Sequence, residues 1–241
     1  TVRDGTLRLA ADELTGYFWS YRLGARGQIF YASRPDWFTP FSVTPVIGLN
    51  GTGNDLDPTL SSDGTLLVFR HNTPGDDLWM ATRVSNTEFT SPMAILNLNS
   101  AESDAQPSFR PGGEELLFQS YRSGSGDLYR TTRVAATTFA APTLITELVS
   151  TFDDGDPVLS TDGLTLYFRS SRPTTLAAQN IYVATRPTLG SPFDPPVLVP
   201  NVNSGGDDGP ATVSPDGCRL YLSSDRAGTN DIYVARRGDG P

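Results

Sequence analysis

The sequence has 241 residues, of which 37% are hydrophobic and 10% aromatic, enough for a substantial core in one domain or two small ones. Its 27 acidic residues outnumber 18 basic residues, all of them arginine, so the net charge of -9 leaves no basic patch for nucleic acid. The absence of lysine excludes Schiff-base catalysis, the single cysteine excludes an intramolecular disulfide, and the single histidine excludes a zinc site built from a histidine cluster.

Five similar units follow one another along the chain, and each ends in a strand-like segment that closes on an arginine. These arginines are 49, 50, 53 and 51 residues apart, at Arg34, Arg83, Arg133, Arg186 and Arg237. The units cover about residues 1–50, 51–99, 100–149, 150–203 and 204–241. A repeat of about 50 residues is typical of β-propeller blades, so we predict a single propeller domain over residues 1–241.

Each unit begins with an inner strand, a tight turn and a second strand. The first inner strand is expected near Leu7 to Ala10, and clear copies of the whole pattern cover 58–69, 157–168 and 211–222. Asp-Gly in the turn indicates a hairpin, because both central residues of such a turn can adopt positive φ. The second strands are apolar on both faces, as at 166–168, which indicates sheets that are covered on both sides.

A third strand follows in each unit, in which a polar residue precedes an aliphatic and an aromatic one. The last of these strands is expected near Asp231 to Arg236. An outer strand comes next, over 89–96, 139–145 and 193–199. The pattern predicts an all-β, five-bladed propeller of four-stranded antiparallel blades. The last unit ends before a fourth strand, so this blade either lacks its outer strand or is completed by residues outside this sequence.

The repeated residues Asp-x-Asp-Pro-x-Leu-Ser-x-Asp-Gly, Leu-Tyr-Phe, Ser-x-Arg and Asp-Ile-Tyr-Val-Ala-x-Arg resemble the TolB-type, WD40-like propeller repeat over essentially the whole chain. The resemblance implies an antiparallel propeller in the bacterial envelope or the secreted space that acts as an interaction scaffold. It implies no activity, because propellers host hydrolases, lectins and binding platforms alike. The TolB architecture has six blades beside a second domain, whereas this sequence contains five units.

An aspartate stands eight residues before the turn in all five units. Because one ligand would not need five copies, we interpret these residues as caps of the loop that enters the inner strand, or as partners of a neighbouring blade's arginine. The alternative is a ring of carboxylates that holds Ca²⁺; apart from this we expect no metal and no cofactor. The aspartates are Asp4, Asp55, Asp104, Asp154 and Asp208, and the arginines of the Ser-x-Arg segments are Arg22, Arg122, Arg172 and Arg226.

Equivalent positions that differ between the blades are better candidates for a specific site. Two such positions, one after the aromatic residue of the second strand and one at the start of the inner strand, face the channel on the loop-rich side. Arginine offers forked hydrogen bonds and tryptophan a stacking face, which suits a polar, anionic or sugar-like ligand. The alternative is a polar, water-filled channel. The predicted ligand-binding funnel consists of Trp19, Arg70, Gln119, Arg169, Asp57 and Asp156.

For function we favour a non-catalytic binding propeller that recognises a protein segment or a polar ligand in this funnel. No catalytic residue is assigned, and we expect a monomer. The alternatives are a sugar-binding lectin and a glycoside hydrolase, which needs two carboxylates roughly 5 to 10 Å apart. Asp57 and Asp156 are the candidates for that pair, and nothing in the sequence raises the pKa of either.

The family resemblance places the protein in the periplasm or outside the cell. No segment approaches the roughly 20 apolar residues of a membrane span. No signal peptide precedes Thr1, so a leader would have been removed. Three single residues are expected to have local roles: His71 in an exposed loop, Cys218 as a small buried side chain of a second strand, and Trp79 in the core.

Overall fold

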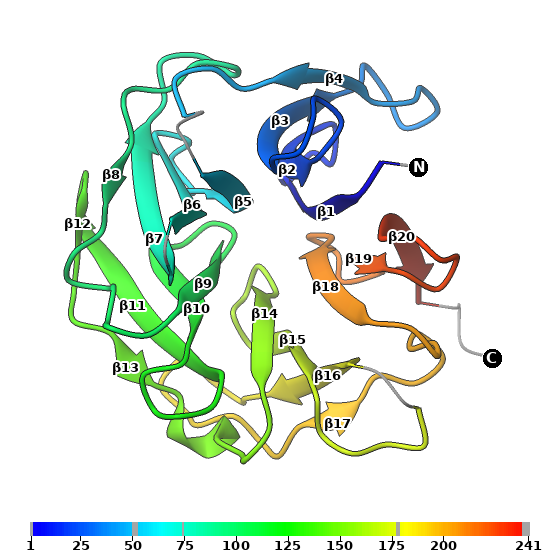
Figure 1. The fold of residues 1–241 in the computed structure, drawn as a ribbon. Helices are drawn as coiled ribbons and strands as arrows, with labels where there is room; N and C mark the ends of the chain where they lie inside the picture. The colour runs from blue at the N-terminus through cyan, green and yellow to red at the C-terminus, as the bar shows by residue number, and fades with distance from the viewer. Residues whose placement is uncertain (1, 50–52, 74, 177–178, 238–241) are drawn as a thin grey trace.

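The computed structural model is a ring of five antiparallel sheets around a central channel (Figure 1). It describes residues 2–49, 53–73, 75–176 and 179–237. Each sheet is built from one sequence unit, and its strands run from the channel to the rim in chain order. The predicted all-β, five-bladed propeller is therefore confirmed.

The first two blades each have four strands. Blade one consists of β1 (Asp4–Leu9), β2 (Thr15–Ser20), β3 (Gln28–Ser33) and β4 (Ser42–Pro45). Blade two consists of β5 (Asn54–Leu60), β6 (Leu66–Thr73), β7 (Gly75–Thr82) and β8 (Met93–Ala94). The inner strand β1 begins at Asp4, earlier than the expected start at Leu7, so the chain enters the channel wall almost at once.

The third blade has two short outer strands that both pair with its third strand, and it is followed by the 3-10 helix Thr146–Leu148. Its strands are β9 (Asp104–Phe109), β10 (Glu115–Ser120), β11 (Asp127–Ala135), β12 (Thr138–Phe139) and β13 (Thr143–Leu144). Blade four consists of β14 (Asp154–Leu159), β15 (Thr165–Ser170), β16 (Asn180–Thr185) and β17 (Val197–Leu198).

The last blade has three strands among the described residues, which agrees with the missing outer strand expected from the sequence. They are β18 (Asp208–Val213), β19 (Arg219–Ser224) and β20 (Asp231–Arg236), and the last of them has the predicted bounds. Residues 238–241 lie outside the described residues. Blade five contacts blade one through β1, which closes the ring.

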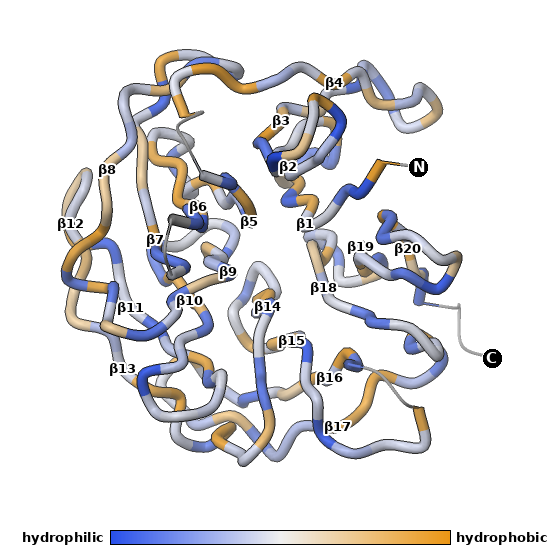
Figure 2. Tube along the Cα trace, in the orientation of Figure 1, coloured by the Kyte–Doolittle hydropathy of each residue, from blue (hydrophilic) through white to orange (hydrophobic). Residues whose placement is uncertain are grey.

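The core lies in the seams between neighbouring blades, because the second strand of each blade is apolar on both faces. Leu66, Leu67, Val68 and Phe69 of β6 are all fully buried or nearly so. Leu66 and Val68 pack against blade three, whereas Leu67 and Phe69 pack against blade one. Figure 2 shows hydrophobic stretches of the chain at β6 and on the segments that connect the blades.

The turns between first and second strands differ in one respect from the prediction. In the Asp-Gly turns only the glycine adopts positive φ, with values of 70° at Gly64 and 71° at Gly163, because the loop has four residues rather than two. In blade one Glu13 takes the place of this glycine, with φ of 54°. The aspartate instead accepts hydrogen bonds: Asp63 Oδ1 accepts from the Thr65 amide at 3.0 Å and from Ser61 Oγ at 2.6 Å. The aspartate thus stabilises the turn through its side chain.

Two of the single-residue expectations are wrong. His71 is buried within β6, because it occupies the place that a serine takes in the other blades. Cys218 is exposed, because the turn extends to it and β19 begins only at Arg219. Trp79 is half-buried against the seam between blades one and two, as expected for a core residue.

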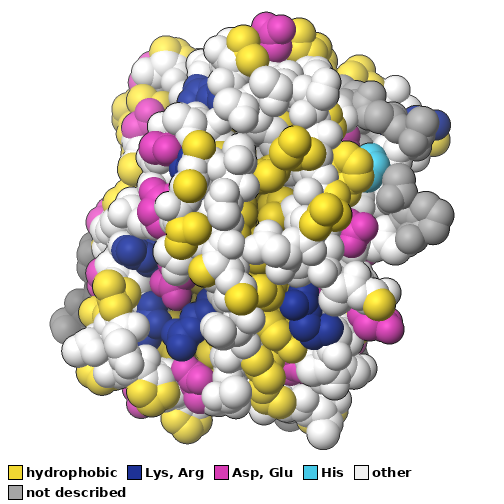
Figure 3. Space-filling view, turned by 90° about the vertical axis from the view of Figure 1, so that its left-hand side faces the viewer, with side chains coloured by type: hydrophobic (Ala, Val, Ile, Leu, Met, Phe, Trp, Pro, Cys, Tyr) yellow, Lys and Arg dark blue, Asp and Glu magenta, His cyan; other side chains and the backbone are white. Residues whose placement is uncertain are grey.

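The outer rim carries exposed hydrophobic side chains, among them Met93 and Val134. On the side of the ring that Figure 3 shows, hydrophobic side chains gather in several groups among polar and charged ones. Within the described residues, no helix has the length and apolar character needed to cross a membrane.

Candidate functional site

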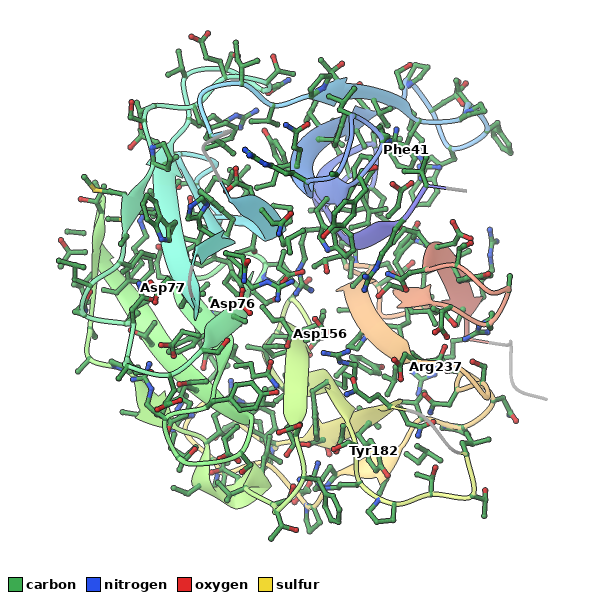
Figure 4. All side chains as sticks on the ribbon, in the orientation of Figure 1. Phe41, Asp76, Asp77, Asp156, Tyr182 and Arg237 are labelled. Carbon is green, nitrogen blue, oxygen red and sulfur yellow. The ribbon has the colours of Figure 1, made fainter. Side chains whose placement is uncertain are left out.

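A cavity of about 600 Å³ lies at the end of the channel where the inner strands begin. Five of the six predicted funnel residues line it: Trp19, Asp57, Arg70, Asp156 and Arg169. Figure 4 shows Asp156 on β14, next to the central channel. The structure thus brings together the positions that differ between blades, and we call this cavity the funnel.

Gln119, the sixth predicted residue, does not line the cavity. It is buried, and its Nε2 donates a hydrogen bond to the Asp154 carbonyl at 3.0 Å, which joins blades three and four. The residue that faces the cavity from blade three is Gln106, whose Oε1 accepts the Asp156 amide at 2.8 Å. Both glutamines therefore connect neighbouring blades.

The inner strands carry a bulge at the residue that faces the funnel. Thr6, Asp57, Gln106 and Asp156 have φ values of 47°, 52°, 55° and 48°, in the left-handed region that favours glycine. Each such residue costs about 1 kcal/mol or more, so the surrounding sheet must impose the conformation. The bulge interrupts the pairing of inner and second strands at this point in the four blades. It turns the side chain toward the channel.

Blade five departs from this rule in its backbone conformation. Its strand pairing also shifts, between Pro210 and Thr212, but Pro210 occupies the bulge position and proline cannot adopt positive φ. Two small residues, Gly209 and Ser223, line the funnel on this side. Gly209 packs closely against blade four, since a Cβ atom there would lie 3.0 Å from Asp156 Oδ2.

The charged groups of the funnel form two matched pairs. Arg70 Nε lies 2.9 Å from Asp57 Oδ2, and Arg169 Nε lies 2.9 Å from Asp156 Oδ2. Asp57 also accepts a hydrogen bond from Thr6 Oγ1 at 2.8 Å. Each pair comes from the inner and second strands of one blade, so the pleat of a single sheet fixes its geometry.

Burial and neighbouring charges shift the pKa values of two groups near the bottom of the funnel, Asp156 and Arg8. Burial raises the pKa of Asp156, the nearby Asp57 carboxylate adds to this effect, and the Arg169 guanidinium opposes it. Burial also lowers the pKa of Arg8 to about 10, against the opposing pull of Asp156 and Asp57. Arg8 donates to the carbonyls of Pro157 and Ala211 and separates the funnel from a cavity of about 370 Å³ at the opposite end.

Trp19 lies in the wall rather than open to the funnel. It is 6% exposed, and its Nε1 donates to Thr6 Oγ1 at 3.1 Å. Its ring covers Gly5, where a Cβ atom would approach to 2.3 Å, and the Arg3 guanidinium lies 5.5 Å from the ring centre. Stacking of a ligand on Trp19, as the sequence suggested, requires Arg3 to move.

Sequence reasoning missed the contribution of blade five to the funnel rim. These residues lie in the loops that lead into β18 and β20, and nothing in a comparison of equivalent strand positions selects them. They are Asp207, Asp225, Gly228, Thr229 and Asn230. Asp208, the repeated aspartate at the start of β18, also lines the funnel.

The repeated aspartates form ion pairs in the structure. The pairing with the Ser-x-Arg arginines agrees with the sequence analysis, but each arginine belongs to the same blade as its aspartate and not to a neighbouring one. Asp55 instead accepts from His71 Nδ1 at 2.7 Å. The pairs are Asp4–Arg22 at 2.9 Å, Asp104–Arg122 at 2.7 Å, Asp154–Arg172 at 2.6 Å and Asp208–Arg226 at 2.7 Å.

Each of these interactions occupies one carboxylate oxygen of an aspartate that was considered for calcium. Within the described part of the chain, no three side chains of His, Cys, Asp or Glu are grouped so that they could hold a metal ion. That the aspartates cap loops stays a prediction, with Ca²⁺ binding as its alternative, and the effect of EDTA on the melting temperature tests between the two.

Solved structures with a similar fold include glycoside hydrolases and TolB proteins. An endo-arabinase from Bacteroides thetaiotaomicron matches with a TM-score of 0.66 over 99% of this chain and 95% of its own, at 17% identity. A thermostable family-43 glycoside hydrolase matches with a TM-score of 0.64 over 100% and 92%, at 12% identity. TolB from Acinetobacter baumannii matches with a TM-score of 0.57 over 98% of this chain, at 16% identity.

The chain shares the fold of TolB. It spans about half of that protein, 55% of the TolB chain. No protein-family model matches the sequence, and no curated protein matches it. The resemblance of the repeats to TolB is confirmed as a likeness of fold, and the activity of a TolB-like propeller of this size has to be argued from its own funnel.

Proposed function

We propose that the protein is a non-catalytic binding propeller whose funnel holds a hydroxyl-rich, sugar-like ligand. The observation that carries the proposal is the pairing of the funnel charges, Asp57 with Arg70 and Asp156 with Arg169. Each pair presents donors and acceptors side by side. Hydroxyl groups donate and accept at one position, so they complement such pairs without adding an unbalanced charge.

Part of each charged pair is open to the cavity. The Arg70 and Arg169 side chains are 22% and 26% exposed, and that of Asp156 is 12% exposed, so a ligand can reach them. Asp57 Oδ2 and Arg70 Nε are buried against each other as an ion pair, and they hold the Arg70 guanidinium in place for a ligand.

The charge of the rim favours a neutral ligand over an anion. Asp207, Asp208 and Asp225 line the funnel on the blade-five side, whereas Arg3 is the additional cation among the lining residues. Since Arg70 and Arg169 are already paired with carboxylates, no net positive field remains to attract an anion.

The test is calorimetric titration of the protein with neutral oligosaccharides, with uronic-acid oligosaccharides as the anionic comparison. Arg169→Ala is expected to weaken binding of the neutral ligand about tenfold or more, the loss of one charged hydrogen bond. Arg237→Ala is the matched control, because Arg237 is exposed beyond β20 at the opposite end of the ring. Equal affinity of the R169A variant and the control would overturn the proposal, and so would a preference for the anionic ligand.

A second candidate is glycoside hydrolysis, favoured by the raised pKa of Asp156 beside a second carboxylate. Solved structures of an endo-arabinase and a family-43 glycoside hydrolase have the same ring. A general acid must be protonated near the working pH, which burial of Asp156 promotes. The Arg169 guanidinium at 2.9 Å favours the ionised form, and this is why we place hydrolysis second.

The two candidates differ in what happens to a bound sugar. If the protein is a hydrolase, incubation with arabinose-containing polysaccharides releases reducing ends, and Asp156→Asn abolishes this release. If it is a binding protein, the wild type binds the sugar and releases nothing, and D156N changes affinity only.

A further inference from the structure

A second cavity lies in the channel, at the end where the inner strands finish. It has a volume of about 370 Å³ and is lined by residues of all five blades. Arg8 separates it from the funnel, so we call it the arginine cavity. Ligand pockets of proteins have volumes of about 300–1,000 Å³, and the arginine cavity therefore has room for a small organic molecule.

One blade differs from the other four at the level of the channel between the two cavities. The inner strand β1 places Arg8 there, and the equivalent residues of the other inner strands are small. All of them line the arginine cavity, namely Thr59, Ser108, Val158 and Thr212. The repeat alone would place a small residue at this position in every blade. The long charged side chain is thus a feature of this channel and not of the blade.

The Arg8 guanidinium is held by backbone groups and not by a carboxylate. It donates to the Ala211 carbonyl and, through Nη2, to the Pro157 carbonyl at 3.4 Å. Its Nε is buried and has no hydrogen-bond partner among the described residues. A guanidinium has five N–H donors, so Arg8 keeps donors that an anion can use.

The funnel aspartates do not neutralise Arg8. Asp57 and Asp156 favour its charged form, but each of them forms an ion pair with the arginine of its own blade. Burial outweighs their effect and lowers the pKa of Arg8 to about 10. An anion in the arginine cavity would offset this cost, because an opposite charge at close range favours the charged form.

The two cavities differ in the balance of their charges. Among the described residues, three arginines and five aspartates line the funnel, whereas Arg8, Arg83, Arg110 and a single aspartate line the arginine cavity. This aspartate, Asp63, is paired with Arg133 at 2.8 Å, and Arg110 lies 3.7 Å from Glu115. In a protein with a net charge of -9, the arginine cavity is a local positive region that favours an anion.

The rest of the lining supplies hydroxyl groups at the level of Arg8 and apolar groups at the mouth. The Ser108 hydroxyl has no hydrogen-bond partner among the described residues. Thr59 Oγ1 accepts from the Phe109 amide at 3.0 Å and keeps its own proton to donate. Ala10, Ala11 and Pro111 lie at the mouth, where the inner strands lead into their turns. This arrangement suits a carboxylate attached to an apolar body.

We propose that the arginine cavity is a binding site for a small carboxylate with an apolar body. Arg8 holds the carboxylate, the hydroxyl groups of Ser108 and Thr59 add donors, and the apolar body of the ligand stays at the mouth. An inorganic oxyanion would use only the polar part of this cavity. The site lies at the end of the channel opposite the funnel and is independent of it.

The test is calorimetric titration of the full chain with benzoate, with benzamide and sulfate as comparisons. Benzamide has the shape of benzoate without its charge, and sulfate has the charge without the apolar body. We expect benzoate to bind at one site, and both comparison compounds to bind about tenfold more weakly or worse. Equal affinity for benzamide, tighter binding of sulfate, or no binding of benzoate would each overturn the proposal.

Matched variants locate the site. Arg8→Met keeps most of the side-chain volume without the charge and should weaken benzoate binding about tenfold or more. Arg130→Met is the control, because it removes the same charge from β11, outside the lining of both cavities. It should bind benzoate as the wild type does.

A second variant keeps Arg8, so the proposal stays testable if Arg8→Met does not fold. Ser108→Leu places an apolar side chain in the arginine cavity and should abolish benzoate binding, whereas Ser108→Ala removes one hydroxyl group and should weaken it about threefold. Melting temperatures of the free proteins show whether each variant is folded. Wild-type affinity of the folded Ser108→Leu variant would contradict a site in this cavity.

Discussion

The seam between blades one and two and the seam between blades five and one are held together by different forces. The first contains Val46 and Leu49 within a continuous apolar cluster. At the second, Glu13 accepts hydrogen bonds from Arg219 at 3.1 and 2.8 Å and from the Tyr221 hydroxyl at 2.6 Å. Among the described residues, the seam between blades five and one thus combines an apolar cluster around Leu7 and Phe30 with a buried polar network.

The difference predicts how each seam tolerates change. Apolar packing is non-directional and distributed over many contacts, so no single polar group decides it. A buried network depends on every member, since removing one leaves the others unsatisfied. Substitutions should therefore have their largest effects at the closing seam.

The largest effect is expected for Glu13→Ala. Glu13 is 2% exposed, and its loss leaves the Tyr221 hydroxyl without its acceptor and Arg219 with Asp216 as its remaining partner, at a cost of about 2 kcal/mol in the free energy of unfolding. Urea denaturation measures this. Glu114→Ala is the control, because Glu114 is largely exposed and lies 3.6 Å from Arg133; its change should stay within about 0.5 kcal/mol. Equal losses in the two variants would show that the seams do not differ.

An intermediate effect is expected for the pH dependence of stability, at two aspartates that occupy equivalent positions in blades four and five. Burial raises the pKa of Asp154 to about 6, and its bond from Ser150 Oγ is long, 3.3 Å. The pKa of Asp208 is lowered, because hydrogen bonds from Ser224, Arg226 and Ser204 outweigh the opposing effect of burial.

The two aspartates should therefore act on stability with opposite sign. A folded-state pKa above the unfolded value of about 3.9 means that Asp154 favours folding most below pH 4, and that this contribution is lost as the pH rises through 6. The contribution of Asp208 is present above pH 4 and is lost on acidification. Between pH 4 and 7 the Asp154 carboxyl lowers the free energy of unfolding by on the order of 1 kcal/mol, and Asp154→Asn should remove this decrease. Asp208→Asn should instead remove an increase of the free energy of unfolding with pH. Carboxyl carbon NMR titration gives both pKa values; similar values would contradict the prediction.

The smallest effect is expected from completing the seam between blades three and four. Asn99 and Asn203 each follow an aliphatic residue and bond to the backbone of the third strand, as Asn99 Oδ1 does to the Leu78 amide at 2.8 Å. Val149 occupies this place in blade three and is 48% exposed. Val149→Asn should stabilise the protein by about 0.5–1 kcal/mol in thermal unfolding, and the reciprocal Asn99→Val should destabilise it. A Val149→Asn variant no more stable than Val149→Thr would argue against this role.

The repeat made the blades and the aspartate–arginine pairs predictable, because both depend on residues close in sequence within one unit. The direction in which a side chain points was harder to predict from the sequence than the blades were. Gln119 occupies the same position as Arg70 and Arg169, which line the funnel, but it bonds to the Asp154 carbonyl of blade four instead, and Gln106 lines the funnel in its place. Cys218 looked like a strand residue because small apolar residues occur in both turns and strands.

The shape of the funnel could not be predicted from the sequence for a different reason. Its wall combines residues from all five blades, such as Thr6, Gln106 and Gly209, and such a wall exists only after the ring has closed. His71 was misplaced because the Ser-x-Arg pattern that defines its position is absent from blade two.

The exposure of Cys218 has a practical consequence. It is the only thiol of the chain and lies in the turn before β19, at the end of the ring opposite the funnel. A maleimide linker attached there tethers every molecule to a sensor surface in the same orientation, with the funnel toward the solution. Because the sequence contains no lysine, amine-reactive reagents leave the side chains around the funnel unmodified, so an immobilised sample presents one uniform face to a library of glycans.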